Sequence, residues 1–232
     1  MSPEAPVPIF KVLKTEKKGG MALNVKLNLE GLGAEVTLLT NEKEIIKSRH
    51  IDSKSRQHIL RVDWGEEEKA DPLSIESINS IDFGLYDGII ISDYDKGLLS
   101  VQAIEHILSK TNQKPVFVDS KKRDLSCYEN CILKINKKEN DCATNFPSNF
   151  ELIVTLGEDG VLYRGENFTT KKVEIFDVCG AGDTFLSALA CAYLTTNNME
   201  RSIEFANHCS GIVVQKFGTY AIKREDINDL CF

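Results

Sequence analysis

Gly88-Ile89-Ile90-Ile91-Ser92 is a continuous apolar run in which no polar residue alternates with the isoleucines. A strand with one face in solvent alternates apolar and polar residues, whereas a strand covered on both faces does not. Three similar runs follow at residues 115–119, 131–135 and 152–156, and helical patterns separate the strands. This arrangement predicts an α/β fold in which a mainly parallel central sheet is covered by helices on both faces.

The rest of the chain supplies helices and shorter strands. Apolar residues at helical spacing run from Met21 to Leu32, and Gly33 follows as a C-terminal stop. Residues 161–163 follow an Asp-Gly turn and predict an edge strand of the sheet. The other predicted elements are strands at 6–13 and 35–40, two strands within 44–63, and helices at 100–110, 181–194 and 199–216.

Composition narrows the classes of protein. The chain has 232 residues, of which 42% are hydrophobic, so it is long enough for one large domain with a sizeable core. The net charge of −7 and the lack of a long basic run argue against nucleic-acid binding. No apolar run approaches a membrane span, and the start of the chain lacks the features of a signal peptide. Seven cysteines without a regular framework favour reduced thiols, so we expect a cytoplasmic protein with no membrane partner.

Polar side chains cluster where the predicted strands end. Asp93, Asp119, Lys134, Asn136 and Thr155 lie at or just past the carboxyl ends of successive strands. In open parallel sheets, ligands bind outside these ends. We therefore treat the five residues as one candidate region.

The segment Gly180-Ala181-Gly182-Asp183 opens the predicted helix at 181–194. Unpaired N–H groups and the helix dipole make a helix start suitable for anions, and small residues let the backbone close on a phosphate. A carboxylate repels phosphate, so we expect Asp183 to handle a proton instead. Together these features suit phosphoryl transfer to a hydroxyl. A helix start with a capping aspartate is the simpler interpretation of the same residues.

Three other segments carry related chemistry, and each has a structural alternative. Asp93 and Lys96 follow a buried strand and could reach substrate oxygens, but a polar turn before a helix has the same sequence. Asn136 and Glu139 share a face if a helical turn forms, which suits hydrated magnesium, whereas a helix cap would use the same pair. The glycines of segment 155–160 permit close approach of a nucleotide or form a plain hairpin turn.

Taken in order, these segments resemble the ribokinase-like (PfkB-type) carbohydrate kinases. The resemblance covers nearly the whole chain, and the Gly-Ala-Gly-Asp segment marks the superfamily. The segment Ser2-Pro3-Glu4-Ala5-Pro6-Val7-Pro8 points to the branch that phosphorylates heptose 7-phosphates. The other segments that carry the resemblance are 19–25, 92–97, 119–121, 136–139, 154–160, 177–184 and 205–219.

The resemblance implies a ribokinase-like three-layer α/β/α sandwich with a mainly parallel sheet and a small β lid. The chain would form a single PfkB-type kinase domain over residues 1–232. Residues 1–18 and about 41–64 would form the lid, and residues 19–40 and 65–232 the α/β core. Lid closure would exclude water, which otherwise competes with the sugar as acceptor. Lids in the family often pair between subunits, so the resemblance also implies a homodimer through the lid.

The resemblance implies roles for individual residues. Asp183 would be the base that takes the proton of the sugar hydroxyl. The N–H groups of Gly180, Ala181 and Gly182 would hold the transferring phosphoryl group. Asn136 and Glu139 would bind magnesium, through water, and the ATP phosphates. The residues that would bind the nucleotide are Lys137, Lys138, Thr155, Gly157, Asp159, Gly160 and Asn207. The residues that would bind the sugar substrate are Gly19, Gly20, Asn24, Arg49, Asp93 and Lys96.

The implied activity is ATP-dependent phosphorylation of a sugar phosphate, namely D-glycero-D-manno-heptose 7-phosphate at C1, on the route to ADP-heptose. ATP and Mg²⁺ would be required, and a monovalent cation would be a further cofactor. One alternative keeps the kinase but changes the acceptor to another sugar. A second alternative is a truncated, non-catalytic relative that binds a nucleotide or a partner protein.

Departures from the family pattern motivate the second alternative. The family normally begins with a strand carrying a Gly-Asp…Asp pattern, whereas this sequence starts at Met1-Ser2-Pro3. Because that strand supplies a sugar-binding aspartate, we expect its absence to weaken sugar binding. Cys179 stands where the family usually has threonine, and His58 stands where the heptose branch has glutamine.

Overall fold

The computed structural model describes residues 2–41, 44–55, 57–67 and 69–227. Its largest element is a six-stranded sheet with the order β3-β4-β5-β6-β7-β8. Strands β3 to β6 run parallel, and β7 pairs antiparallel with both β6 and β8, which confirms the predicted mainly parallel sheet. The strands are Ile89–Asp93 (β3), Val116–Ser120 (β4), Cys131–Asn136 (β5), Phe150–Thr155 (β6), Val161–Tyr163 (β7) and Glu166–Phe168 (β8).

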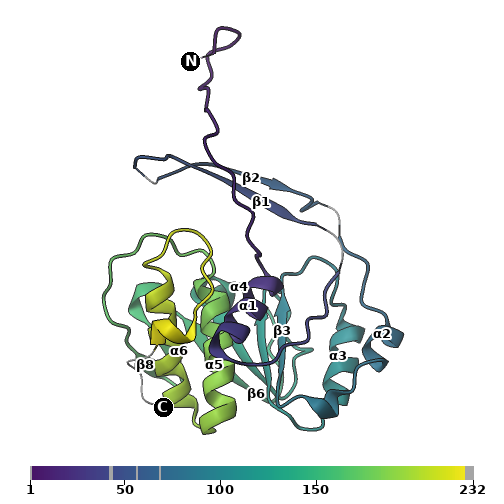
Figure 1. Ribbon diagram of the computed structural model, residues 1–232. Coiled ribbons are helices and arrows are strands. Elements are labelled where there is room, and N and C mark those ends of the chain that lie inside the picture. The colour runs from purple at the N-terminus through teal and green to yellow at the C-terminus, as the bar shows by residue number, and fades with distance from the viewer. Residues whose placement is uncertain (1, 42–43, 56, 68, 228–232) are drawn as a thin grey trace.

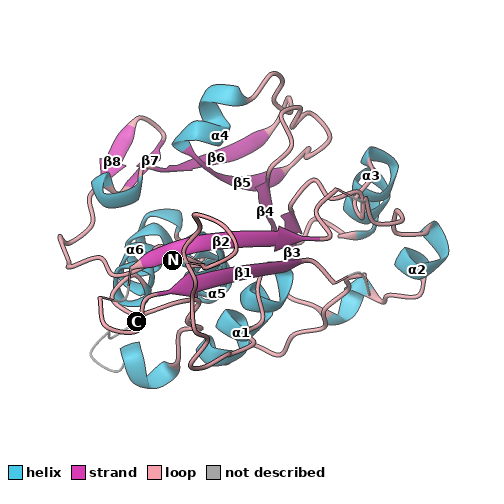
Figure 2. Cartoon of the chain, turned by 90° about the horizontal axis from the view of Figure 1, so that it is seen from above, coloured by secondary structure: helices cyan, strands magenta, loops and turns pink. Residues whose placement is uncertain are grey.

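Helices cover both faces of this sheet (Figures 1 and 2). Successive residues of β4 illustrate the layers, because Phe117 packs in the cluster of α5 and α6 and Val118 in the cluster of α3. Helix α1 packs against α5, and α2 lies beside α3. The predicted three-layer sandwich is therefore confirmed. The helices are Ala22–Leu32 (α1), Ile75–Asn79 (α2), Val101–Lys110 (α3), Lys137–Cys142 (α4), Ala181–Thr196 (α5) and Met199–Val213 (α6), with 3-10 turns at Phe83–Leu85 (η1), Gly157–Asp159 (η2) and Arg224–Ile227 (η3).

Capping residues define the helix ends much as the sequence predicts. The side chain of Ser100 accepts a hydrogen bond from the Ala103 N–H at the start of α3. At the end of α1, Gly33 has φ 96°, and a residue with a side chain rarely adopts this left-handed conformation. The predicted C-terminal stop at Gly33 is therefore confirmed.

A separate antiparallel hairpin consists of β1 (Ile46–Ile51) and β2 (His58–Trp64) and lies across the top of the α/β body (Figures 1 and 2). This confirms the two strands predicted within 44–63. Its register places Arg49 opposite Arg61 on one face and Ile46 opposite Trp64 on the other. The hairpin therefore has a charged face and a mainly apolar face.

Two predicted strands, at 6–13 and 35–40, are wrong, since neither segment lies in a strand. A strand is stable only when its N–H and C=O groups pair with a neighbouring strand. Residues 6–13 are exposed and rise away from the body (Figure 1). Segment 35–40 meets the body through the hydroxyl of Thr37, which accepts a hydrogen bond of 2.9 Å from Tyr86. The assignment of residues 1–18 to a lid remains a prediction.

The predicted edge position of residues 161–163 is also wrong. β7 pairs with β6 on one side and with β8 on the other. Strand β8 was not predicted because it has only three residues, two of them polar, and so carries little apolar signal. The antiparallel edge of the sheet is therefore β8.

None of the helices in the described ranges combines the length and the apolar character that crossing a membrane requires.

Burial between the two helical layers makes the stability of the fold sensitive to small changes in β5. We expect Leu133→Ala to lower the free energy of unfolding by about 2–5 kcal/mol, because the fully buried side chain leaves a cavity. Urea unfolding monitored by circular dichroism measures this loss. The matched control is Leu85→Ala, whose side chain is 78% exposed and whose change should stay within about 0.5 kcal/mol. Equal effects of the two substitutions would contradict this description of the core.

Candidate active site

The start of α5 forms a cradle of backbone N–H groups, defined here as Gly180, Ala181 and Gly182. Gly180 caps the helix with φ 84° and offers no side chain to the first turn. A Cβ on Gly180 would lie 2.8 Å from Nδ2 of Asn24, so only glycine fits. The Ala181 N–H donates a hydrogen bond of 3.2 Å to the Val178 carbonyl, whereas in the described part of the chain no acceptor is found for the N–H groups of Gly182 and Asp183. The helix dipole and these free donors make the cradle a site for an anion.

The carboxylate of Asp183 lies beside this cradle and is oriented by two other elements. Asn24 of α1 donates a hydrogen bond of 2.8 Å to Oδ2, and the hydroxyl of Tyr94 donates one of 2.8 Å to Oδ1. Burial raises the pKa of Asp183, although these two hydrogen bonds favour its ionised form. Burial also raises the pKa of Tyr94 strongly, so its hydroxyl remains a donor. A fixed carboxylate with a raised pKa suits a general base.

Two further polar residues hold α1 against α5. The side chain of Asn28, which is fully buried, donates a hydrogen bond of 2.8 Å to the Asn24 carbonyl. Its Oδ1 accepts a hydrogen bond of 2.9 Å from the hydroxyl of Thr184. Sequence reasoning missed Asn28, Thr184 and Tyr94. Tyr94 lies inside a segment already singled out, and a tyrosine between two aspartates was the available signal.

A row of alternating charges lies at the ends of β4 and β5. Nζ of Lys134 is 2.6 Å from Oδ2 of Asp119, and Nζ of Lys121 is 3.0 Å from its Oδ1. Lys121 continues to Glu139, at 2.5 Å. Burial opposes ionisation of Asp119, but the ammonium groups of Lys134 and Lys121 lower the pKa of its carboxyl below the usual value. Asp119 is therefore held as a carboxylate by two cations.

Asn136 and Glu139 form a capping box at the start of α4. Oδ1 of Asn136 accepts from the Glu139 N–H at 2.9 Å, and Oε2 of Glu139 accepts from the Asn136 N–H at 2.8 Å. The structural alternative of a helix cap is thus realised. The oxygens are donors of the type that magnesium prefers, and each has a lone pair beyond its present hydrogen bond. The pair therefore fits an ion held through its water shell, while Lys137 and Lys138 are exposed on the first turn of α4.

The residues predicted for the nucleotide lie around the β6–β7 turn and α6. Gly157 has φ 67°, and a Cβ added to it would meet nothing within 4 Å, so its backbone is open to a ligand. Gly160 is different, since a Cβ there would lie 2.2 Å from the carbonyl oxygen of Phe168. Nδ2 of Asn207 donates a hydrogen bond of 3.0 Å to that same carbonyl. Thr155 ends β6, and Asp159 lies exposed in η2.

The residues predicted for the sugar fall into two groups. Asn24 touches Asp183, and Gly19 and Gly20 come just before α1, with open space beside Gly20. Asp93 and Lys96 are engaged elsewhere. Oδ2 of Asp93 accepts hydrogen bonds from Lys122 at 2.6 Å and from Tyr128 at 2.7 Å, and Nζ of Lys96 is 3.6 Å from Glu66. The structure gives Asp93 and Lys96 no contact with Asp183.

The charged face of the hairpin points to the α5 cradle. Burial raises the pKa of the Cys179 thiol, and the guanidinium group of Arg49 opposes this rise. Arg61 also interacts electrostatically with Cys179, and Nε2 of His58 is 3.4 Å from Oδ2 of Asp177. Burial works against ionisation of Asp177, but hydrogen bonds from Cys179 lower the pKa of its carboxyl. The N–H of Gly218 donates to the same carboxylate at 3.1 Å. A contact of the hairpin with Asp177 is therefore a contact with the loop that enters the cradle.

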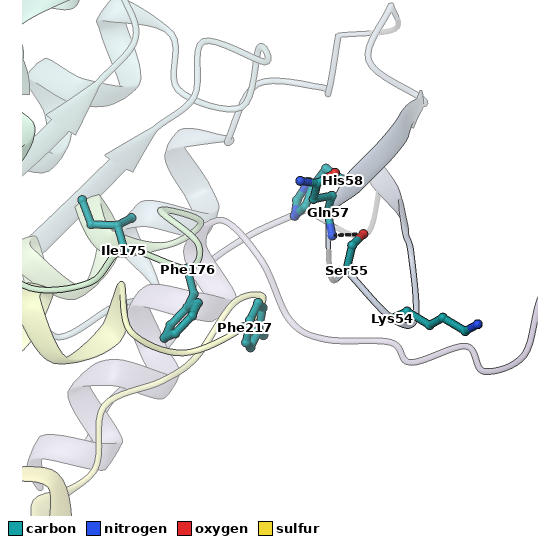
Figure 3. A pocket seen from close by; sticks show the side chains of 7 residues that line it. All are labelled: Lys54, Ser55, Gln57, His58, Ile175, Phe176 and Phe217. Carbon is teal, nitrogen blue, oxygen red and sulfur yellow. Dashed lines mark hydrogen bonds between the residues drawn. The ribbon is translucent and has the colours of Figure 1, made fainter.

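A cavity of about 790 Å³ lies between the tip of this hairpin and the loops next to the cradle (Figure 3). The ring centroids of Phe176 and Phe217 are 4.9 Å apart on one side of the cavity, and Gln57 and His58 lie on the other. The volume is in the range of sites for small molecules. The lining residues are Lys54, Ser55, Gln57, His58, Ile175, Phe176 and Phe217.

Comparison with known proteins agrees with this geometry. The model of the pfkB family carbohydrate kinases matches residues 40–226. Proteins named bifunctional protein HldE are similar over almost the whole chain: the one from Sulfurimonas denitrificans is 33% identical over 283 residues, covering 99% of this chain and 59% of that protein. The one from Nitratiruptor sp. is 33% identical over 279 residues, covering 99% and 60%. The chain thus spans about three fifths of the length of these relatives.

Solved structures show the same fold at low sequence identity. Phosphofructokinase-2 from Escherichia coli, in complex with potassium, superposes with a TM-score of 0.72 at 15% identity and covers 97% of this chain and 91% of its own. Ribokinase from Arabidopsis thaliana, complexed with ribose and ATP, gives a TM-score of 0.58 at 16% identity, covering 79% and 68%. These similarities confirm the predicted ribokinase-like fold.

The hydrogen bond from Tyr94 to Asp183 predicts a shift in acidity. We expect Tyr94→Phe to raise the pKa of Asp183 further, because the variant removes a donor that stabilises the carboxylate while the site stays buried. Titration of the side-chain carboxyl ¹³C resonance by NMR measures this pKa. In the control Tyr86→Phe, the lost hydroxyl contacts Thr37, and the pKa of Asp183 should stay unchanged. An unchanged or lowered pKa in Tyr94→Phe would show that the tyrosine does not stabilise the base.

Proposed function

The chain belongs to the pfkB family of carbohydrate kinases, and from that premise we propose that it transfers the terminal phosphoryl group of ATP to a hydroxyl of a sugar phosphate. The observation that carries the proposal is the oriented carboxylate of Asp183 beside the free N–H groups at the start of α5. A general base beside an anion cradle is the arrangement that phosphoryl transfer to an alcohol requires.

Asp183 and the cradle have separate roles in the proposed transfer. Asp183 takes the proton of the acceptor hydroxyl as that oxygen forms a bond to phosphorus. The bond from phosphorus to the bridging oxygen breaks, and its electron pair leaves with ADP. The cradle of Gly180, Ala181 and Gly182 holds the transferring group while it carries its charge. Base assistance of this kind speeds a reaction by roughly 10²–10⁴-fold.

The nucleotide lies, in this proposal, along the carboxyl ends of β5 and β6. Asn136 and Glu139 would hold hydrated magnesium, which would supply positive charge to the ATP phosphates when bound. Gly157 leaves its backbone open to the nucleotide, and Asn207 fixes α6 against the last residue of β8. The proposed groove is completed by Thr155, Asp159 and Gly160, and by Lys137 and Lys138, which are exposed on α4. On the same grounds we propose ATP as the donor.

For the acceptor we propose D-glycero-D-manno-heptose 7-phosphate, phosphorylated at C1. Support comes from the segment of residues 2–8, which resembles the heptose branch, and from relatives named HldE. Gly19, Gly20 and Asn24 lie on the side of Asp183 where the sugar would bind, and Arg49 faces the cradle from the hairpin. The structure favours Asn24 over Asp93 and Lys96 as a sugar ligand, because only Asn24 reaches Asp183.

The proposed base predicts a sharp separation between catalysis and binding. We expect Asp183→Asn to lower kcat by at least about 10²-fold, because the variant has no base for the acceptor proton, while ATP binding survives. Release of ADP measured with a panel of sugars and sugar phosphates tests activity and acceptor together, and isothermal titration measures ATP binding. If Asp183→Asn kept the wild-type rate, the mechanism would be wrong, and transfer to another sugar in the panel would change the acceptor.

One observation favours a second function, that of a non-catalytic protein that binds a nucleotide or a partner. β3 forms the outer strand of the described sheet, and residues 35–40 add no strand to it. Titrations with ATP and with heptose 7-phosphate separate the two functions. Binding of both supports the kinase, whereas binding of ATP alone with no transfer to any sugar supports the second function.

We also propose that two copies of the chain pair through their hairpins. The apolar face of the hairpin turns away from the cradle, since Arg49 and Arg61 on the other face act on Cys179. On this apolar face Leu60 is 49% exposed and Trp64 is 60% exposed. Large exposed apolar side chains on one sheet face are typical of a surface that a protein partner covers.

The hairpin surface predicts a dimer that apolar substitutions abolish. We expect the wild-type chain to sediment as a dimer and the double variant Leu60→Ser/Trp64→Ser as a monomer, because the variant removes the exposed apolar area. Sedimentation velocity measures the mass. Leu85→Ser removes a leucine outside the hairpin that is more exposed, at 78%, and should leave the dimer intact. A monomeric wild-type chain, or a dimer in all three proteins, would refute pairing through this face.

A further inference from the structure

Lys134 is a buried cation in the middle of the sheet. The residue is 2% exposed and lies on β5 between β4 and β6. Its neighbours Leu133 and Ile135 pack toward α3, so Lys134 faces the layer of α5. A buried lysine loses its hydration, and it is found almost only where a partner compensates the charge. Here Asp119 compensates it, at 2.6 Å.

The ammonium group of Lys134 reaches the wall of the cradle. A Cβ built on Gly182 would lie 3.0 Å from Nζ of Lys134. In an α-helix the Cα–Cβ bond tilts toward the N-terminus, and the free N–H groups of the first turn point the same way. The ammonium group and the cradle N–H groups therefore border the same space. Any side chain at position 182 would compete with the ammonium group for it.

This position is unfavourable for a lysine on electrostatic grounds. The first turn of a helix carries a partial positive charge, which repels a cation. The charged groups that face Lys134 are Asp119 of β4 and Asp183 of α5, and Lys121 and Tyr94 contact these two carboxylates in turn. A cation kept at the positive end of a helix, within reach of free N–H donors, makes the site attractive to an anion.

We propose, on the basis of the kinase function proposed above, that Lys134 is a catalytic residue whose ammonium group contacts the phosphoryl group in the cradle and stabilises its negative charge during transfer. Asp119 keeps this ammonium group in place before the substrate arrives, so little reorganisation is needed at the moment of reaction. The proton of the acceptor still passes to Asp183, and the electron pair of the broken bond still leaves with ADP. Nothing is transferred to or from Lys134.

The first test is the substitution Lys134→Met, which keeps an unbranched apolar stem and removes the charge. Loss of one preorganised stabilising donor lowers kcat by about 10²–10³-fold, and we expect a fall of this size with little change in the KM for ATP. The matched control is Lys114→Met. The Lys114 ammonium group also makes hydrogen bonds, to the half-buried carbonyl of Phe83 and the exposed carbonyl of Gly84, but lies outside the site. This control should keep kcat within about twofold.

A binding measurement tests the same contact without turnover. ADP with aluminium fluoride and Mg²⁺ imitates the phosphoryl group during transfer, so the wild-type chain should bind it at least about tenfold more tightly than Lys134→Met does. Affinity for ADP alone should be equal in the two proteins. If the wild-type chain phosphorylated no sugar, the kinase function would fail, but this comparison would still test Lys134.

The double variant Asp119→Asn/Lys134→Met guards against a purely structural explanation. Removing Lys134 alone leaves the buried Asp119 carboxylate with only one of its two cations, Lys121, and lowers stability, whereas the double variant removes both buried charges. We expect the double variant to regain thermal stability but not kcat or fluoride-complex affinity. The proposal is overturned if kcat recovers along with stability, if Lys134→Met keeps the wild-type kcat, or if its affinity for the fluoride complex falls no more than its affinity for ADP.

Discussion

The carboxylate of Asp183 is half-buried at the start of α5, where it needs compensation for the hydration that it loses. Asn24 and Tyr94 supply that compensation, and they come from α1 and from the loop after β3. The site therefore forms only when the helical layer and the carboxyl end of the sheet meet at this point. Asn28 extends the constraint one turn along α1, because it bonds to Asn24 and to Thr184 at once.

The buried ion pair of Asp119 and Lys134 contributes little to the stability of the fold. Burying two charges removes their hydration, and the attraction between them seldom exceeds that loss by much. An apolar pair at the same positions of β4 and β5 would fit the surrounding core at least as well. The presence of charge beside the cradle is thus better explained by the reaction than by folding. The raised pKa of Asp183 is likewise better explained by the reaction than by folding. Once ionised, this carboxyl contributes less to stability than an exposed aspartate would.

The regular part of the fold could be predicted because burial leaves a clear pattern. The runs that became β3 to β6 have no polar alternation, and their order with the helices predicts a parallel sheet. Segments 6–13 and 35–40 show where this reasoning fails. Their composition is typical of strands, but a strand also needs a neighbour, and the presence of a neighbour is a property of the assembled sheet.

The candidate site was predictable to the level of segments rather than contacts. The cradle residues and Asp183 were singled out because small residues at a helix start let the backbone close on an anion. Asp93 and Asp119 both end buried strands, and their sequences do not show that one bonds to Lys122 and Tyr128 while the other bonds to Lys134. Which face of the sheet a strand-end residue occupies depends on the register, and a shift of one residue exchanges the faces.

The hairpin of β1 and β2 is a small sheet whose stability is low, so its position over the site depends on its contacts. Two strands alone are at most marginally stable in water, so the position of β1 and β2 depends on contacts with the body. One such contact joins His58 to Asp177, and the same carboxylate accepts from Gly218 and from the backbone of Cys179 at 2.9 Å. An anion in the cradle would attract Arg49 and Arg61, which lie opposite each other across the strands, although Asp63 already compensates the charge of Arg61 at 2.6 Å. Binding of an anionic substrate would therefore draw the hairpin toward the cradle, so that the substrate itself supplies the force that closes the site around it.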